Sequence, residues 1–70
     1  GGDDNPVMAM VLDTFNQQAS KSDDGCSVAE VIAILAGRGV AAADVHRAVD
    51  QLALDGALYT TIDDHHYRPT

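Results

Sequence analysis

The spacing of apolar residues along this 70-residue chain changes once, at Gly56. Before that glycine, three segments repeat apolar residues at i, i+3, i+4 and i+7, which marks one face of an amphipathic helix. After it, the segment from Leu58 to Ile62 is rich in β-forming residues and indicates a strand. The change of period predicts three helices followed by a β-hairpin.

The first predicted helix begins after Asn5 and ends before the polar segment 20–25. Asn5 can cap free amides, and Pro6 fits the first helical position because its missing N–H is not needed there. We expect residues 1–4 to be an unstructured lead-in or the scar of an expression tag, and residues 5–70 to form one domain. The apolar face of this helix consists of Met8, Val11, Leu12, Phe15 and Ala19.

The second predicted helix starts at Ser27 and Glu30, which have the spacing of a capping box. In that motif the Ser hydroxyl accepts the N–H of the Glu, and the Glu carboxylate accepts the N–H of the Ser. Gly37 and Gly39 end the helix. The three residues before it, 25–27, have room for one or two residues of extended strand. Its buried side consists of Val28, Val31, Ile32, Leu35 and Ala36.

The third predicted helix starts near Ala42 to Asp44, runs to about Asp55 and ends at Gly56. Its apolar face consists of Val45, Ala48, Val49 and Leu52. The order helix, short strand, helix, helix, hairpin is that of a winged helix. This α+β fold has three helices and a small antiparallel sheet that carries a hairpin wing. Packing on the helices and on the short strand near Cys26 would stabilise a hairpin that is marginal by itself.

The hairpin is predicted to pair Leu58–Ile62 with Tyr67–Thr70 around a turn at 63–66. Strand alternation then places Leu58, Thr60 and Ile62 on the inner face and leaves Tyr59 beside the surface. The expected cross-strand pairs are Ile62 with Tyr67, Thr61 with Arg68, and Tyr59 with Thr70.

The charge of the chain restricts its partners. Eleven acidic residues against four basic ones give a net charge of −7, the wrong sign for holding a phosphate backbone or an anionic membrane. The third helix, which enters the major groove in DNA-binding members of this fold, offers one arginine and one histidine against three aspartates. There is no signal peptide and no run near the ~20 apolar residues of a membrane span. We therefore expect a soluble, intracellular protein with basic partners; a DNA-contacting or dimerising helix-turn-helix regulator is the alternative.

Four consecutive residues with ligand-type side chains, Asp63, Asp64, His65 and His66, suggest a metal or an acid/base site at first sight. Neighbouring side chains diverge, however, whereas a structural zinc needs four ligands and a catalytic zinc three. A hairpin tip also offers solvent instead of a pocket that could tune an acid or base. Cys26 has no partner at metal-ligand or redox spacing and is predicted to be a small buried residue. We predict a turn, with no metal, no cofactor and no enzyme activity.

Asp55 occupies the end of the third helix, where an acid faces the negative end of the helix dipole at a cost of about 0.3–1 kcal/mol. Either this is a solvated surface acid, or a cationic partner uses the charge. Tyr59 likewise either covers the sheet or forms a recognition surface rimmed by Asp55, Asp63 and Asp64.

The segment Ala48–Thr70, AVDQLALDGALYTTIDDHHYRPT, resembles the C-terminal winged-helix domain of the middle subunit of replication protein A. The stretch DGALYTTIDDHHY carries the likeness, because winged helices in general lack an acidic wing of this form; residues 6–47 fit in helix order and length. The resemblance implies a nuclear protein-docking module of a single-stranded-DNA-binding complex, acting in DNA replication, repair and recombination. Other subunits would be joined through regions outside this chain.

The resemblance implies that the partners are basic, partly amphipathic helices of uracil-DNA glycosylase, the xeroderma pigmentosum group A factor, a recombination mediator and an annealing helicase, with no direct DNA binding by this domain. His65 stands where an acid is common, and Gln51 where a large apolar residue would fit, so partner choice is expected to differ from that of relatives. The partner-binding positions that match the family are Asp55, Tyr59, Thr60, Asp64 and Thr70, to which the charge pattern adds Asp63.

Overall fold

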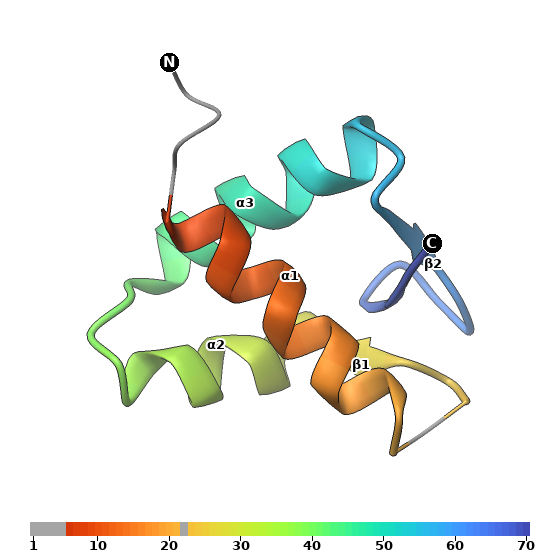
Figure 1. Ribbon diagram of the computed structural model, residues 1–70, viewed down its shortest axis with the longest axis horizontal. Coiled ribbons are helices and arrows are strands. Elements are labelled where there is room, and N and C mark those ends of the chain that lie inside the picture. The colour runs from red at the N-terminus through yellow and green to blue at the C-terminus, as the bar shows by residue number, and fades with distance from the viewer. Residues whose placement is uncertain (1–5, 22) are drawn as a thin grey trace.

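The computed structural model describes residues 6–21 and 23–70; the predicted lead-in and the Asn5 cap lie outside these residues. The strands gather beside the end of the first helix, the start of the second and the end of the third (Figure 1). This is the α+β arrangement of a winged helix, as predicted. In the described parts of the chain, no helix has the length and apolar character needed to cross a membrane. The elements are α1 (Pro6–Ala19), β1 (Cys26–Ser27), α2 (Val28–Ala36), α3 (Ala42–Leu54), β2 (Leu58–Thr60) and β3 (His66–Pro69).

The core lies between the three helices and the inner face of the sheet. The ring of Tyr67, on β3, meets the ring of Phe15, on α1, edge to face, with centroids 6.0 Å apart and planes at 72°. This geometry places the positive edge of one ring against the negative face of the other, and it ties the sheet to α1. The largest fully buried side chains come from all three helices and β1: Val11, Phe15, Cys26, Val31, Leu35 and Val45.

The predicted apolar faces are confirmed most fully on α3, where every predicted residue is buried: Val45, Ala48, Val49 and Leu52. On α2, Val28, Val31 and Leu35 are buried. Ile32 is only partly buried and Ala36 is exposed, so the buried stripe of α2 is narrower than its apolar spacing suggests.

On α1, one buried residue escaped the apolar pattern. Thr14 is buried, and its hydroxyl donates to the carbonyl oxygen of Met10 at 2.7 Å. This bond within the helix satisfies the hydroxyl, which is why a polar side chain is tolerated in the core. The predicted face is buried at Val11 and Phe15 and partly buried at Met8, Leu12 and Ala19.

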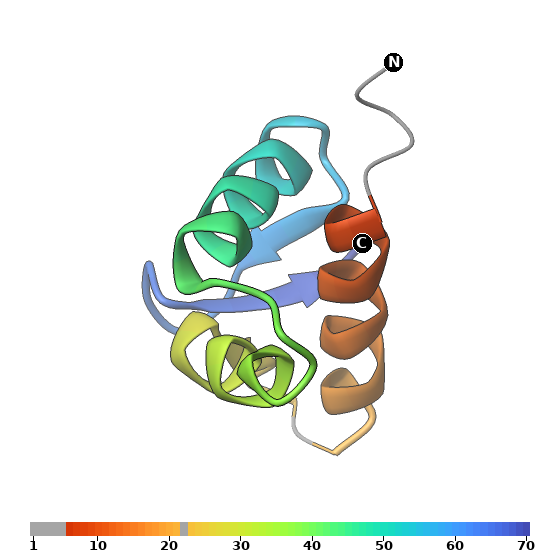
Figure 2. The same cartoon turned by 90° about the vertical axis from the view of Figure 1, so that its left-hand side faces the viewer.

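The sheet is antiparallel with strand order β1-β3-β2, so the last strand of the chain is central. The two residues of β1, predicted as a short extended segment, pair Cys26 with Tyr67 and Ser27 with His66. The connection between β2 and β3, which we call the wing turn (residues 61–65), projects on the side away from α1 (Figure 2).

The hairpin register differs from the predicted one. The observed pairs are Leu58 with Pro69, Tyr59 with Arg68, and Thr60 with Tyr67, so the predicted pairs Ile62–Tyr67, Thr61–Arg68 and Tyr59–Thr70 are wrong. The cause lies in the wing turn. The N–H of His66 donates to the Asp63 carbonyl at 3.4 Å, and the N–H of Thr61 donates to the His66 carbonyl at 3.0 Å. These bonds end the strand pairing at Thr60 and Tyr67, before Ile62 can pair. The pairing slips by two residues, an even number, so side chains keep their predicted faces.

The inner face is shorter than predicted. β2 ends at Thr60, and β3 begins at His66, one residue before the predicted start. Leu58 is buried as expected, but Thr60 is exposed and Ile62, which was expected to pack inward, is 60% exposed. Thr60 keeps the face of Leu58 by alternation. It is nevertheless exposed because β2 is a short edge strand whose far end leads into the projecting wing turn.

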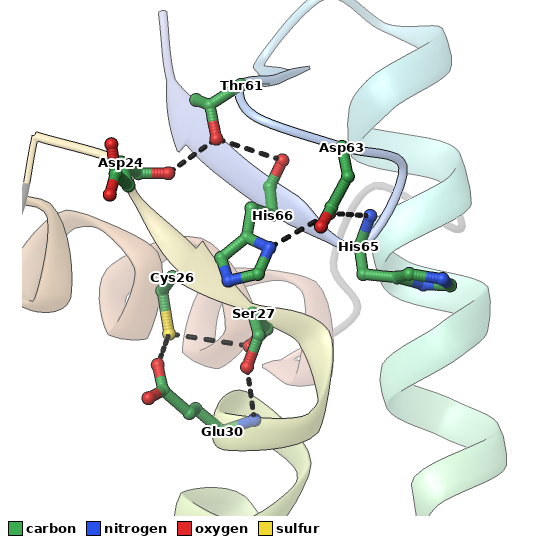
Figure 3. Close-up of polar contacts among 8 residues, drawn as sticks. All are labelled: Asp24, Cys26, Ser27, Glu30, Thr61, Asp63, His65 and His66. Atoms are coloured by element: carbon green, nitrogen blue, oxygen red, sulfur yellow. Dashed lines mark hydrogen bonds and ion pairs between the residues drawn. The ribbon is translucent and has the colours of Figure 1, made fainter.

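The predicted capping box forms only in part. The Ser27 hydroxyl accepts the N–H of Glu30 at 3.1 Å, as expected for the N-cap of α2. The Glu30 carboxylate, however, accepts the thiol of Cys26, with Sγ 3.2 Å from Oε2 (Figure 3). The thiol also lies 3.4 Å from the Ser27 carbonyl oxygen, so the carboxylate is one of two acceptors beside the buried S–H.

Gly25 allows the chain entering β1 to pass close to β3. Its φ is +83°, a conformation that L side chains rarely adopt. A Cβ at this position would overlap the carbonyl oxygen of Tyr67 and lie 2.8 Å from Cγ of Arg68. Glycine is therefore required both by the backbone conformation and by the space available.

Candidate functional site

Asp55 lies at the exposed C-terminal end of α3, where the sequence places it. Its N–H donates to the Gln51 carbonyl at 2.9 Å, and its Oδ1 accepts from Nε2 of Gln51 at 3.1 Å. Gly56 follows with φ +81° and turns the chain into β2. Gln51 thus holds the carboxylate of Asp55, a role that the sequence analysis missed. The available signal was the i, i+4 spacing of the two residues on one helix.

Tyr59 lies on the outer face of the sheet and is 47% exposed. Arg68 stands directly across from it on β3 and shares that face, because opposed residues of an antiparallel pair point to the same side. Nη1 of Arg68 donates to the Asp23 carbonyl at 2.9 Å and lies 4.0 Å from the Asp23 carboxylate. The guanidinium is therefore engaged by the α1–β1 loop, next to a tyrosine that is only half covered.

The two hydroxyl residues of the predicted site occupy different places. Thr60 is exposed on β2, an edge strand of the sheet. Thr70 is also exposed, and its N–H donates to the carbonyl of Ala57 at 3.0 Å. This bond places the chain end beside the α3–β2 turn that carries Asp55.

The wing turn contains the two remaining acids. Oδ1 of Asp63 accepts the N–H of His65 at 2.8 Å and lies 2.9 Å from Nδ1 of His66 (Figure 3). The hydrogen bond from His66, followed by the bond from the His65 amide, lowers the pKa of Asp63 below its usual value of 3.8. Asp64 is exposed, and within the described residues its carboxylate makes no hydrogen bond or ion pair.

The predicted site residues follow the hairpin and do not converge on a point. Asp55 and Thr70 lie at the α3–β2 turn, Tyr59 and Thr60 lie on β2, and the wing acids lie at the opposite end. Ala57 and Asp63 are six positions apart in the sequence, which corresponds to at most about 20 Å at a strand rise of ~3.3 Å per residue. Such an arrangement suits an elongated partner better than a small ligand.

Two exposed apolar side chains on the same segment were not predicted. Leu54, the last residue of α3, is 81% exposed, and Ile62, in the wing turn, is 60% exposed. With Tyr59 they are three of the four large apolar residues that the described part of the chain leaves exposed; the fourth is Ile34, on α2. The segment 54–62 therefore combines acidic and apolar groups at the surface.

The described residues contain no group of three or more His, Cys, Asp and Glu side chains placed to hold a metal ion. Cys26 is buried, as predicted. Burial, and then the hydrogen bond and the charge of Glu30, raise the pKa of its thiol to about 12. A thiol with so high a pKa is protonated at neutral pH and is a poor nucleophile.

A protein-family model described as "Replication protein A C terminal" matches residues 2–65. A search of curated proteins and a search of solved structures each gave no match. The matched residues include the three helices, β1, β2 and the wing turn, whereas β3 and Thr70 lie beyond them. The resemblance found in the sequence is thereby confirmed over most of the chain, and the chain belongs to the replication protein A C-terminal family.

Proposed function

We propose that this domain is a protein-docking module of replication protein A, the single-stranded-DNA-binding complex for which its family is named. It binds basic amphipathic helices along the hairpin. The observation that carries this proposal is the half-exposed Tyr59, which lies along the chain between two exposed acids, Asp55 at the end of α3 and Asp64 in the wing turn.

Charge supports a cationic partner. The chain has a net charge of −7, and acids flank β2 on both sides, at the end of α3 and in the wing turn. The nearby cation, Arg68, is engaged by Asp23. Individual exposed ion pairs contribute only about 0.2–1 kcal/mol, so these acids set orientation and association rate more than tightness.

The apolar contribution supports an amphipathic partner. Leu54, Tyr59 and Ile62 are each exposed, and each would gain free energy if a partner covered it. Burying a Leu or an Ile fully stabilises a complex by about 1.5–3 kcal/mol relative to leaving it exposed. Partial burial of these groups together with the acidic contacts is compatible with micromolar affinity, about −8 kcal/mol.

The length of the hairpin supports a short helix. A span of at most about 20 Å corresponds to no more than roughly 13 residues of α-helix, since a helix rises ~1.5 Å per residue. A peptide of this length is marginally helical when free, so it would fold as it binds. Tethering the domain to a complex that also holds DNA would raise the effective affinity.

The proposed partners are basic helical segments of replication, repair and recombination proteins in the nucleus: uracil-DNA glycosylase, the xeroderma pigmentosum group A factor, a recombination mediator and an annealing helicase. The other subunits of the complex would be reached through regions outside this chain. We further propose that the domain neither binds DNA directly nor catalyses a reaction.

Direct DNA binding is the competing function. On α3, the exposed surface carries Asp44, Asp50 and the C-capping Asp55 beside Arg47 and His46. Phosphate contacts depend on Lys and Arg. A helix with this charge distribution would repel a duplex more than it attracts one.

The test is an NMR titration of the labelled domain. The ligands are a peptide with leucines at i, i+3, i+4 and i+7 and lysines elsewhere, a scrambled peptide of the same composition, a short duplex and a single strand of DNA. We expect shifts within residues 54–70 from the amphipathic peptide alone. Shifts across residues 42–54 caused by DNA would refute the proposal.

A charge-matched pair of variants locates the surface. Changing Asp55→Lys together with Asp64→Lys should abolish peptide binding and leave the fold intact. Changing Asp13→Lys together with Asp50→Lys alters the net charge equally at exposed positions on α1 and α3. If both double variants lose binding to the same extent, overall charge and not the hairpin governs the interaction.

A further inference from the structure

The two adjacent acids of the wing turn have different surroundings. Asp63 uses one carboxylate oxygen for two contacts, with the His65 amide at 2.8 Å and with Nδ1 of His66 at 2.9 Å. Its carbonyl oxygen lies 3.4 Å from the His66 amide. An aspartate that accepts from the backbone two residues further on mimics a backbone turn and stabilises it.

The turn that Asp63 organises is also fixed to the rest of the domain. The carbonyl of His65 accepts the N–H of Val28, the first residue of α2, at 2.9 Å. The hydroxyl of Thr61 donates to the carbonyl of Asp24 in the α1–β1 loop and also lies 3.4 Å from the carbonyl of His66 (Figure 3). The bonds of Asp63 therefore shape the wing turn, and the bonds of His65 and Thr61 attach it to α2 and to the α1–β1 loop.

Asp64 lies between Asp63 and His65 and has none of these contacts. It is exposed, and within the described residues no hydrogen bond or ion pair engages its carboxylate. Its charge is free to meet a solvated partner, whereas Asp63 has already committed an oxygen to the turn.

We propose that Asp63 is a positioning residue of the docking surface: its bonds to His65 and His66 hold the wing turn so that Asp64, the wing acid of the proposed function, faces a partner helix. The proposal rests on the proposed docking function. It changes the role of Asp63, because the charge pattern of the sequence made both aspartates part of the acidic rim that contacts the partner.

The test compares Asp63→Asn, Asp63→Ala and Asp64→Asn in the 70-residue chain, with the amphipathic lysine and leucine peptide as the probe. Asp63→Asn and Asp64→Asn each remove one negative charge from the same turn. Asn at 63 can still accept from the His65 amide and from the neutral imidazole of His66, whereas Ala cannot. Affinity is measured by fluorescence anisotropy at low and high salt, and exchange of the His65 amide by NMR.

We expect Asp64→Asn to weaken peptide binding about two- to fivefold at low salt and to reduce its salt dependence. Asp63→Asn should bind nearly as the wild type does, while Asp63→Ala should bind more weakly and exchange the His65 amide faster. Rescue by Asn but not by Ala distinguishes positioning from direct charge contact.

The proposal is overturned if Asp63→Asn loses as much affinity as Asp64→Asn, or if Asp63→Ala leaves the exchange of the His65 amide unchanged. Absence of peptide binding by the wild-type chain would refute the docking function and the partner contact of Asp64 with it. The exchange measurement needs no peptide, so in that case it still decides whether Asp63 holds the turn.

Discussion

The inner and outer faces of the sheet are built from alternate residues of the same strands, but they hold opposite kinds of contact. On the inner face, Cys26 and Leu58 are buried in the common core. On the outer face, Tyr59 is half exposed and Arg68 reaches the α1–β1 loop at Asp23. The inner face therefore contributes most to stability, whereas the proposed recognition uses the outer face. Substitutions on the inner face should affect unfolding, and substitutions on the outer face should affect peptide binding.

The largest expected effect is on the inner face, at Leu58. Leu58→Ala removes a side chain that is 3% exposed, and we expect it to lower the free energy of unfolding by about 2–5 kcal/mol. Leu54→Ala is the matched control, since the same truncation at 81% exposure should change stability by less than about 0.5 kcal/mol. Urea denaturation measures both. Equal losses would contradict the division between a buried and an exposed side.

The next effect tests the close passage of the chain past β3. Gly25 and Gly39 both have φ +83°, but a Cβ at Gly39 would meet no atom within 4 Å. Gly39→Ala should therefore lower the free energy of unfolding only by the strain of a left-handed backbone at a non-glycine residue, about 1–2 kcal/mol. Gly25→Ala should cost clearly more, because its Cβ overlaps the Tyr67 carbonyl. Thermal unfolding of the two variants gives the comparison, and similar melting temperatures would argue against a tight contact at Gly25.

A smaller effect of opposite sign is expected at the end of α3. Asp55→Asn removes a charge that opposes the helix dipole and retains an acceptor for Gln51. It should raise the free energy of unfolding by about 0.3–1 kcal/mol while it weakens peptide binding. Asp44→Asn, in the first turn of α3, should instead destabilise the fold, because an acid there favours the positive end of the dipole. Chemical denaturation checks both signs, and a loss of stability in Asp55→Asn would contradict the expected cost.

The smallest effect is the pH dependence of the wing turn. The folded-state pKa of Asp63 is lowered, so its contribution to stability is fully present above its unfolded value of 3.8 and is lost as the pH falls through the folded value. The difference in melting temperature between the wild type and Asp63→Asn should therefore shrink as the pH is lowered from above 3.8 through the folded value. Asp64→Asn serves as the control for loss of one charge from the same turn. A difference that stays constant over this range would show that the Asp63 carboxylate adds nothing to the fold.

Much of the fold follows from local sequence signals. The glycine after α3, the N-cap at Ser27 and the apolar face of α3 are all where the sequence predicts them. These features depend on contacts between residues a few positions apart, which periodicity and capping rules describe. The family resemblance was also recognisable, because the wing sequence is distinctive.

Prediction from the sequence failed where a position depends on residues distant along the chain or on the contacts of a single exposed side chain. The hairpin register was missed because the bonds of Asp63 and the pairing of β3 with β1 fix it, and alternation alone fits several registers. The exposure of Ile62 was missed because alternation predicts which face of the sheet a side chain is on, but not whether other residues pack against it there. The exposure of Leu54 and the bond from Gln51 to Asp55 escaped notice for a related reason: neither belongs to the buried stripe that periodicity detects.

From sequence, this chain has three amphipathic helices, an acidic hairpin and a charge that disfavours nucleic acid, because these properties reside in local pattern and composition. Only the three-dimensional fold shows which contacts each of the two wing aspartates makes. Asp63 and Asp64 are adjacent and chemically identical, yet the chain folds so that one carboxylate meets His65 and His66 and the other meets solvent. The two carboxylates differ in the direction in which they point, and the order of charges along the sequence does not contain that information.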